Sequence, residues 1–151
     1  MNDNIFKEED VNILIARLNR LKRKTEPLWG KMAVGQMLAH LNIGFEMIYE
    51  KIHPKPNVLM KFILKRFVKK SVVSKTPYPK NARTAPQFLI KEDRDFEVEK
   101  KRIHDYILKT LNHGESYFDG RDYHSFGVMT KEEYNNMLYK HINHHFTQFG
   151  V

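Results

Sequence analysis

The sequence predicts a single all-α domain. Apolar side chains recur at three- and four-residue steps in five segments of the 151-residue chain, and prolines and glycines mark the breaks between them. There is no internal repeat, and no alternating pattern indicates a strand. With 41% hydrophobic residues, a chain of this length can bury one substantial core. We therefore expect residues 1–151 to form one domain.

The first two predicted helices cover residues 8–24 and 33–51. In the first, basic residues cluster in the last turns, where cations interact favourably with the helix dipole. Pro27 and Gly30 separate the two helices. Trp29, the only tryptophan, lies in this connection, and we expect its ring to seal the end of the core.

The third predicted helix, residues 57–73, is basic and amphipathic. We expect its apolar stripe to cover the core and its lysines to face water, in preference to a role on anionic lipid or nucleic acid. The stripe consists of Leu59, Phe62, Ile63 and Phe67. The helix lies within residues 51–91, which hold eleven basic residues and no acidic one, and such a stretch could meet phosphate, a carboxylate substrate or a membrane surface. The basic residues are Lys51, Lys55, Lys61, Lys65, Arg66, Lys69, Lys70, Lys75, Lys80, Arg83 and Lys91.

The remaining chain is predicted to be one long connection and two helices. Residues 74–93 hold three prolines, and an irregular connection of this length is either a functional cover or disordered. A helix over 95–112 follows, and a polar loop leads to the last helix, 130–150. Thr130 and Glu133 have the spacing of a capping box at its start.

Composition excludes several kinds of chemistry. The chain has no cysteine, so it forms no disulfide, offers no thiolate to a metal and has no cysteine nucleophile. It has no apolar run of about 18 residues and no secretory signal pattern, so we expect a soluble, cytoplasmic protein without a transmembrane segment. The net charge of +8 favours anionic ligands.

Three of the eight histidines fall within five positions of the last helix. On a helical wheel, His145 lies near the centre of the apolar arc with His141 beside it, and His144 lies at the edge. The spacing of four places His141 and His145 about 6 Å apart along the axis and about 40° apart around it, so their imidazoles can converge on one ion.

A histidine on the second helix could complete such a site. His40 lies on the flank of that helix's apolar stripe, Gly44 leaves space beside its ring, and Gln36 could orient a ligand or a bound water. Each of these histidines could instead be a hydrogen-bonded interior residue. Both interpretations stay open from the pattern alone.

The residues resemble the DinB-like (YfiT-like) superfamily of metal-dependent enzymes, in a branch of uncharacterised domain-of-unknown-function proteins. The resemblance extends from about residue 28 to the carboxy terminus, and its most specific element is the combination of a histidine on the second helix with HxxHHxxQ on the last. It rests on Trp29-Gly30-Lys31-Met32, Gln36-Met37-Leu38-Ala39-His40-Leu41, Phe126-Gly127 before the capped helix, and His141-Ile142-Asn143-His144-His145-Phe146-Thr147-Gln148-Phe149-Gly150.

The resemblance implies a four-helix bundle with one long crossover connection, to which residues 57–73 add a basic amphipathic helix. It also implies a divalent metal, zinc, nickel or iron, held by His40, His141 and His145. Three neutral imidazoles would leave a coordination position for water or substrate. No general base is identifiable, and the candidates for supporting or proton-transfer roles are Gln36, His124 and His144.

Two functions of different classes follow. The first is a metal-dependent enzyme acting on a small molecule, with an anionic one favoured by the positive charge, either a hydrolase or a transferase that uses a low-molecular-weight thiol. The second is a non-enzymatic binding module in which residues 51–91 meet an anionic partner and the histidines are structural. A nucleic-acid partner is not expected, since no aromatic or arginine-rich groove motif accompanies the basic stretch. The resemblance also suggests a homodimer.

Overall fold

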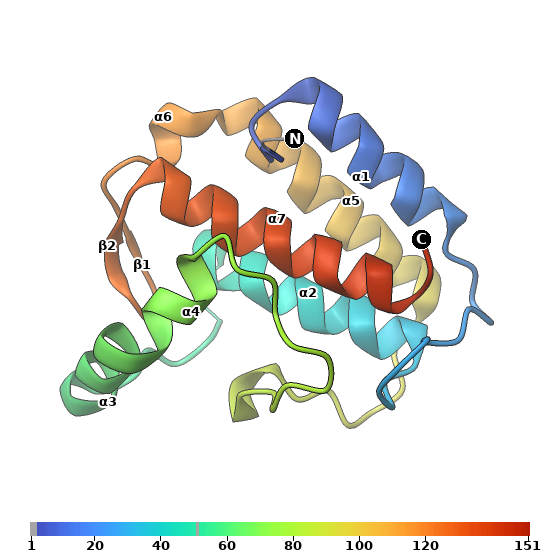
Figure 1. The fold of residues 1–151 in the computed structure, drawn as a ribbon, viewed down its shortest axis with the longest axis horizontal. Coiled ribbons are helices and arrows are strands. Elements are labelled where there is room, and N and C mark those ends of the chain that lie inside the picture. Colours follow the sequence, from blue (N-terminus) through green and yellow to red (C-terminus); the bar gives the residue numbers. More distant parts are fainter. Residues whose placement is uncertain (1–2, 51) are drawn as a thin grey trace.

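Four long helices form the body of the protein in the computed structural model, which describes residues 3–50 and 52–151 (Figure 1). Each helix packs on two of the others: α2 on α5, α5 on α1, α1 on α7, and α7 on α2. Their apolar faces meet in one core that includes Leu14, Phe45, Ile103 and Phe146. The all-α prediction is therefore confirmed at the level of a mostly helical chain. The four helices are α1 (Glu8–Arg20), α2 (Val34–Tyr49), α5 (Phe96–His113) and α7 (Lys131–Gln148).

The start of α7 follows the predicted capping chemistry. The Thr130 hydroxyl accepts a hydrogen bond from the Glu133 backbone N–H, and the Glu133 carboxylate accepts one from the Thr130 N–H, so the predicted capping box is confirmed. Helix α1 is shorter than predicted and ends at Arg20. The reason is a turn in which the Lys22 N–H donates to the Thr25 hydroxyl and the Thr25 N–H donates to the Lys22 carbonyl.

A small hairpin before α7 was not predicted. The one-turn helix α6 (Glu115–Phe118) leads into β1 (Arg121–Tyr123), which pairs antiparallel with β2 (Gly127–Met129). Strands of three residues are too short to show an alternating pattern, so the sequence contains little signal for them. Tyr123 and Met129 face the core, and Val128 faces solvent.

The basic helix predicted over 57–73 exists, but its predicted apolar stripe does not cover the core. It consists of α3 (Val58–Ile63), the π-helical turn η1 (Leu64–Val68) and α4 (Lys69–Val73), together called the arm below. Figure 1 shows α3 at the far end of the arm, projecting from the four long helices. The predicted burial of the apolar stripe is wrong, because Leu59 and Phe67 are each 69% exposed and Phe62 is 61% exposed. The four long helices, α6 and the hairpin supply most of the core, and of the arm only Leu64, Val72 and Val73 pack against it.

Residues 74–93 cross the open side of α2 as the predicted irregular connection, interrupted by one turn, η2 (Pro86–Phe88). Gln36 ties the end of this connection to the start of α2: its amide Nε2 donates to the carbonyls of Lys91 and Glu92 while its Oε1 accepts from the Ala33 N–H. No helix in the described part of the chain is both long and apolar enough to cross a membrane.

Candidate metal centre

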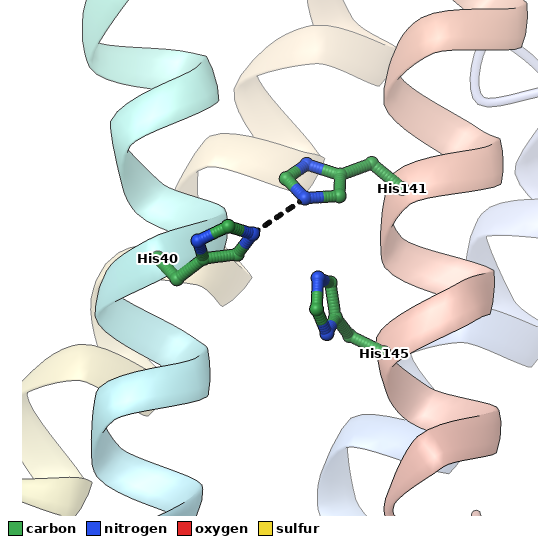
Figure 2. A group of neighbouring side chains, drawn as sticks. All are labelled: His40, His141 and His145. Atoms are coloured by element: carbon green, nitrogen blue, oxygen red, sulfur yellow. Dashed lines mark hydrogen bonds between the residues drawn. The ribbon is translucent and has the colours of Figure 1, made fainter. Parts of the chain in front are cut away.

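The three predicted histidines converge between α2 and α7 (Figure 2). His40 comes from α2, and His141 and His145 come from successive turns of α7. One ring nitrogen from each lies within 4.8 Å of the others. His40 and His145 are buried, and His141 is partly exposed. The inward direction predicted for His141 and His145 is confirmed.

The ring of His40 is oriented by the connection over residues 74–93. Its Nδ1 lies 2.9 Å from the carbonyl oxygen of Phe88. A carbonyl can only accept, so Nδ1 carries the hydrogen and Nε2 keeps its lone pair. That Nε2 lies 2.8 Å from Nε2 of His141, which must therefore donate in the absence of an ion.

The ring of His145 is oriented by a chain of two hydrogen bonds. The backbone carbonyl of Trp29 accepts from Nε2 of Gln148 at 2.7 Å, which fixes the direction of the side-chain amide. Oε1 of Gln148 then faces Nδ1 of His145 at 2.8 Å, so His145 donates from Nδ1. Nε2 of His145 is left as an acceptor, and Figure 2 shows this far nitrogen facing His40 and His141.

Two glycines lie against these side chains. A Cβ at Gly30 would lie 2.6 Å from Nε2 of Gln148, and the positive φ of +84° at Gly30 also disfavours other residues. Gly44 was predicted to leave space beside His40. The space instead lies beside His141, since a Cβ at position 44 would come 4.0 Å from its Nδ1.

Burial keeps the three imidazoles neutral. It lowers the pKa of His40, lowers that of His145 to about 3, and together with the neighbouring His40 and His145 lowers that of His141 well below its usual range. Neutral imidazole nitrogens are ligands for zinc, nickel, copper and ferrous iron. The donor set, the lone pairs directed by His40 and His145, and the spacing of the three residues therefore fit a divalent metal ion.

The three supporting candidates have different positions. Gln36 bonds to backbone atoms at the start of α2 and in the connection, and His124 contacts the Ser125 hydroxyl at 2.9 Å and the Pro54 carbonyl at 3.1 Å. Neither is hydrogen-bonded to the three histidines. His144 lies next to the group, with its ring centroid 5.1 Å from that of His145 and 5.9 Å from that of Trp29.

A cavity of about 940 Å³ opens in front of the histidines. Its walls are mostly apolar and aromatic, and the described residues that line it include no Asp or Glu. Trp29, predicted to seal the core, is instead half-buried at the cavity wall, with the Lys80 ammonium 4.5 Å from its ring centroid. Aromatic and basic residues of the wall include Trp29, Tyr78, Phe88, Tyr123, Phe126, Lys31 and Arg83.

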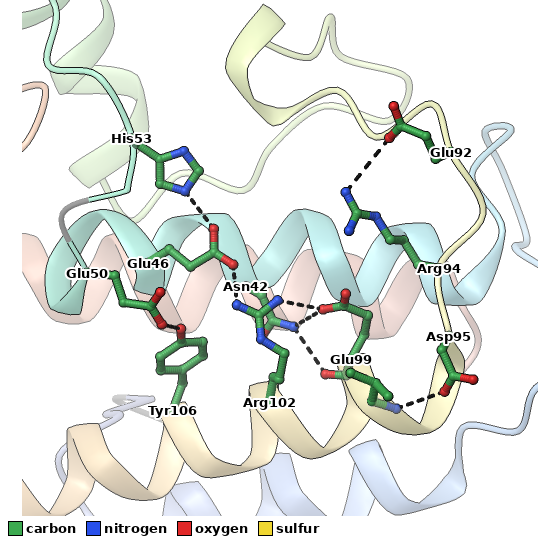
Figure 3. Close-up of polar contacts among 11 residues, drawn as sticks. Asn42, Glu46, Glu50, His53, Glu92, Arg94, Asp95, Glu99, Arg102 and Tyr106 are labelled. Atoms are coloured by element: carbon green, nitrogen blue, oxygen red, sulfur yellow. Dashed lines mark hydrogen bonds and ion pairs between the residues drawn. The ribbon is translucent and has the colours of Figure 1, made fainter.

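The buried carboxylates of Glu46 on α2 and Glu99 on α5 belong to a separate polar network between these two helices (Figure 3). Glu46 contacts His53 at 2.6 Å and forms an ion pair with Arg102, which also binds Glu99 at 3.0 Å. Asn42 donates to the same Glu99 carboxylate at 2.7 Å. This network links α2 to α5 and takes no part in the three-histidine group.

Sequence reasoning missed the groups that orient the histidines. Gln148 had a readable signal, because it stands three residues after His145 and the helix places i and i+3 on one face. The carbonyls of Phe88 and Trp29 had none, since a backbone acceptor can belong to any residue.

A family model described as a protein of unknown function (DUF1569) matches residues 5–150. The chain belongs to this family. Searches of the curated proteins and of the solved structures return no match. The DUF1569 match includes α2, the connection and α7, and so contains every residue of the three-histidine group and the groups that orient it.

Proposed function

We propose that this protein is a metal-dependent enzyme of the DinB-like type, a four-helix bundle that binds one divalent ion through His40, His141 and His145. The observation that carries the proposal is the orientation of the two buried histidines. Each directs Nδ1 at a fixed acceptor and Nε2 at the common centre, the arrangement typical of metal-binding histidines. Structural histidines would need no such common direction.

The cavity supports a small-molecule substrate. It is larger than a water-binding crevice, is mostly apolar, and has Lys31 and Arg83 in its wall, which favour a molecule with an anionic group and an apolar body. A bound ion with three neutral ligands would supply Lewis acidity and lower the pKa of a water or thiol in its open position.

Of the two reaction classes, thiol transfer requires fewer catalytic groups from the protein than hydrolysis does. A hydrolase commonly positions a carboxylate or histidine base beside the attacking water. No carboxylate is among the described residues of the cavity wall, and of the other histidines only His144 is among them. An external thiol requires no base in the wall once its pKa is lowered. The protein's own residues would then bind the electrophile along the aromatic wall and keep water away.

The first test is metal content by elemental mass spectrometry on tag-free protein. The wild type should hold about one equivalent of zinc, nickel or iron, and a variant with His40, His141 and His145 changed to alanine should hold none while keeping its helical circular dichroism. His124→Ala is the matched control and should keep the ion. Wild type that takes up no zinc, nickel or iron, even after reconstitution, would contradict the proposal.

The second test separates the reaction classes. Metal-loaded wild type is assayed with small thiols and a fluorogenic alkylating agent, and in parallel with chromogenic esters and amides. We expect thiol consumption that the triple alanine variant lacks. Ester or amide hydrolysis without thiol transfer would assign the hydrolase class instead.

A further inference from the structure

The arm presents an apolar surface that the rest of the described chain leaves uncovered. Seven of the thirteen exposed large hydrophobic residues in the described chain fall within its α3 and η1 segments. Val58 is 89% exposed, and Leu59 and Phe67 follow at 69%. Exposed apolar side chains gathered on one short helical segment commonly mark a binding site, because exposing them to water is unfavourable. The seven residues are Val58, Leu59, Met60, Phe62, Ile63, Phe67 and Val68.

Hydrogen bonds anchor the other end of the arm to α7. The Lys140 ammonium donates to the carbonyls of Ser71 and Ser74 at 2.8 and 2.6 Å, and the Asn136 amide donates to the Val73 carbonyl at 3.0 Å. Both donors belong to α7. The exposed apolar residues are therefore attached to an anchored segment, so less conformational entropy is lost when a partner binds.

The cations of the arm divide into two groups. Lys61 pairs with Asp122 of the hairpin at 3.4 Å, and Lys69 pairs with Glu133 of α7 at 2.8 Å, so both help to dock the inner side. Lys65, Arg66 and Lys70 are exposed, and in the part of the chain that the structure describes no carboxylate lies within ion-pair distance of them. The outer side is thus both apolar and positively charged.

We propose that the arm docks on the surface of an anionic lipid bilayer. Helices with Phe and Leu among Lys and Arg lie in the interface of such membranes, with the apolar side chains in the acyl boundary and the cations at the lipid phosphates. A second copy of this chain fits the surface less well, because pairing two arms would bring two sets of unpaired cations together. An anionic bilayer complements both the charge and the apolar stripe.

The inner side of the same arm lines the cavity at the histidines. Leu64 and Val72 are part of that wall, and Val68, which is 36% exposed, lies at the boundary between the wall and the exposed surface. Docking through the outer side would bring the cavity close to the bilayer surface, where apolar molecules with an anionic group collect. The docking inference itself does not depend on a metal ion or on catalysis.

The test is flotation of wild-type protein with vesicles of phosphatidylcholine alone and of phosphatidylcholine with 30% phosphatidylglycerol, at about 0.1 M salt. We expect binding to the anionic vesicles only. Lys65→Gln, Arg66→Gln and Lys70→Gln combined should weaken partitioning on the order of a hundredfold, from about a factor of five per charge. Phe62→Ser with Phe67→Ser should weaken it about tenfold or more.

Matched controls use the other side of the molecule. Lys22→Gln, Arg23→Gln and Lys24→Gln remove the same net charge from the turn after α1, and Val98→Ser removes an exposed apolar residue from α5. Both should bind as the wild type does. All of the substituted side chains are exposed, and circular dichroism of each variant checks that it is folded.

Three results would overturn the proposal: no binding to anionic vesicles, equal binding to neutral ones, or equal loss in the control charge variant. A concentration-dependent dimer that Phe62→Ser and Phe67→Ser disrupt, without vesicle binding, would assign the surface to self-association. Phe67→Trp gives a direct readout, because tryptophan emission should shift to the blue when the arm enters the interface.

Discussion

The side-chain amide of Gln148 lies 2.7 Å from the backbone carbonyl oxygen of Trp29, and this contact determines which nitrogen of His145 carries a hydrogen. The carbonyl accepts from the amide N–H, the amide oxygen accepts from Nδ1, and Nε2 is left to face His40 and His141. Gln148, which is not one of the three proposed ligands, thus determines the tautomer of His145, which is.

Gln148→Ala should weaken metal binding by about 10- to 100-fold, the usual cost of removing a partner that orients a ligand histidine. Competition with a chromogenic chelator measures the dissociation constant. Gln36→Ala is the matched control, since Gln36 bonds to the Ala33 N–H and to the carbonyls of Lys91 and Glu92 and to none of the three histidines, and it should change metal affinity little. Equal affinity in wild type and Gln148→Ala would show that Gln148 does not orient His145.

Gly30→Ala should lower both stability and metal affinity. Its φ of +84° costs an alanine about 1 kcal/mol of folding free energy, and the added methyl group would lie 2.6 Å from the Gln148 amide and displace it. Gly120→Ala separates the two effects, because Gly120 has a φ of +73° with nothing within 4 Å of a Cβ. Both variants should lose stability in urea unfolding, and only Gly30→Ala should lose affinity. Similar affinity in the two variants would contradict the role given to this contact.

Arg102→Met should destabilise the protein by about 3 kcal/mol, because it leaves the buried carboxylates of Glu46 and Glu99 without their shared cation. Lys101→Met is the neighbouring control. Lys101 pairs with Asp105 at the surface, so its loss should cost less than about 0.5 kcal/mol. Chemical unfolding in the presence of a metal chelator measures the change in unfolding free energy for both variants. A small effect of Arg102→Met would mean that water compensates the two carboxylates.

The metal-free protein should lose stability in mild acid. Burial lowers the pKa of His145 to about 3, whereas an unfolded histidine titrates near 6.5, so the unfolded chain binds more protons between these values. The free energy of unfolding should therefore fall as the pH drops below about 6.5, by up to about 1.4 kcal/mol per pH unit from His145 alone. His145→Gln should flatten this dependence in urea titrations between pH 7.5 and 4.5. An unchanged slope would show that His145 does not contribute.

The sequence predicted the elements whose signals are local. The capped helix with His141 and His145 was predicted within about two residues at its ends, because its capping box and apolar arc lie within the helix itself. The end of α1 was placed too late, since a threonine hydroxyl competes with helical hydrogen bonding after Arg20. The three-residue strands left no periodic signal.

The role of the arm could not be predicted from its amphipathic pattern. Such a pattern shows that one side is apolar but does not show whether the core has room for it. In this fold the core forms without Leu59, Phe62 and Phe67, which remain exposed. For the candidate site, the sequence predicted which histidine side chains converge. It did not predict the backbone carbonyls of Phe88 and Trp29 that orient them, because the positions of these carbonyls depend on how two connections are placed in space.

The hydrogen bonds of the three-histidine group join positions far apart in the chain. His40 and His141 are separated by 101 residues, and Trp29 and Gln148 by 119. Contacts of such sequence separation require the long intervening loops to close. No fragment that ends before α7 contains the group, and a nascent chain cannot assemble it until α7 has left the ribosome. Acquisition of an ion would therefore report that the whole domain has folded.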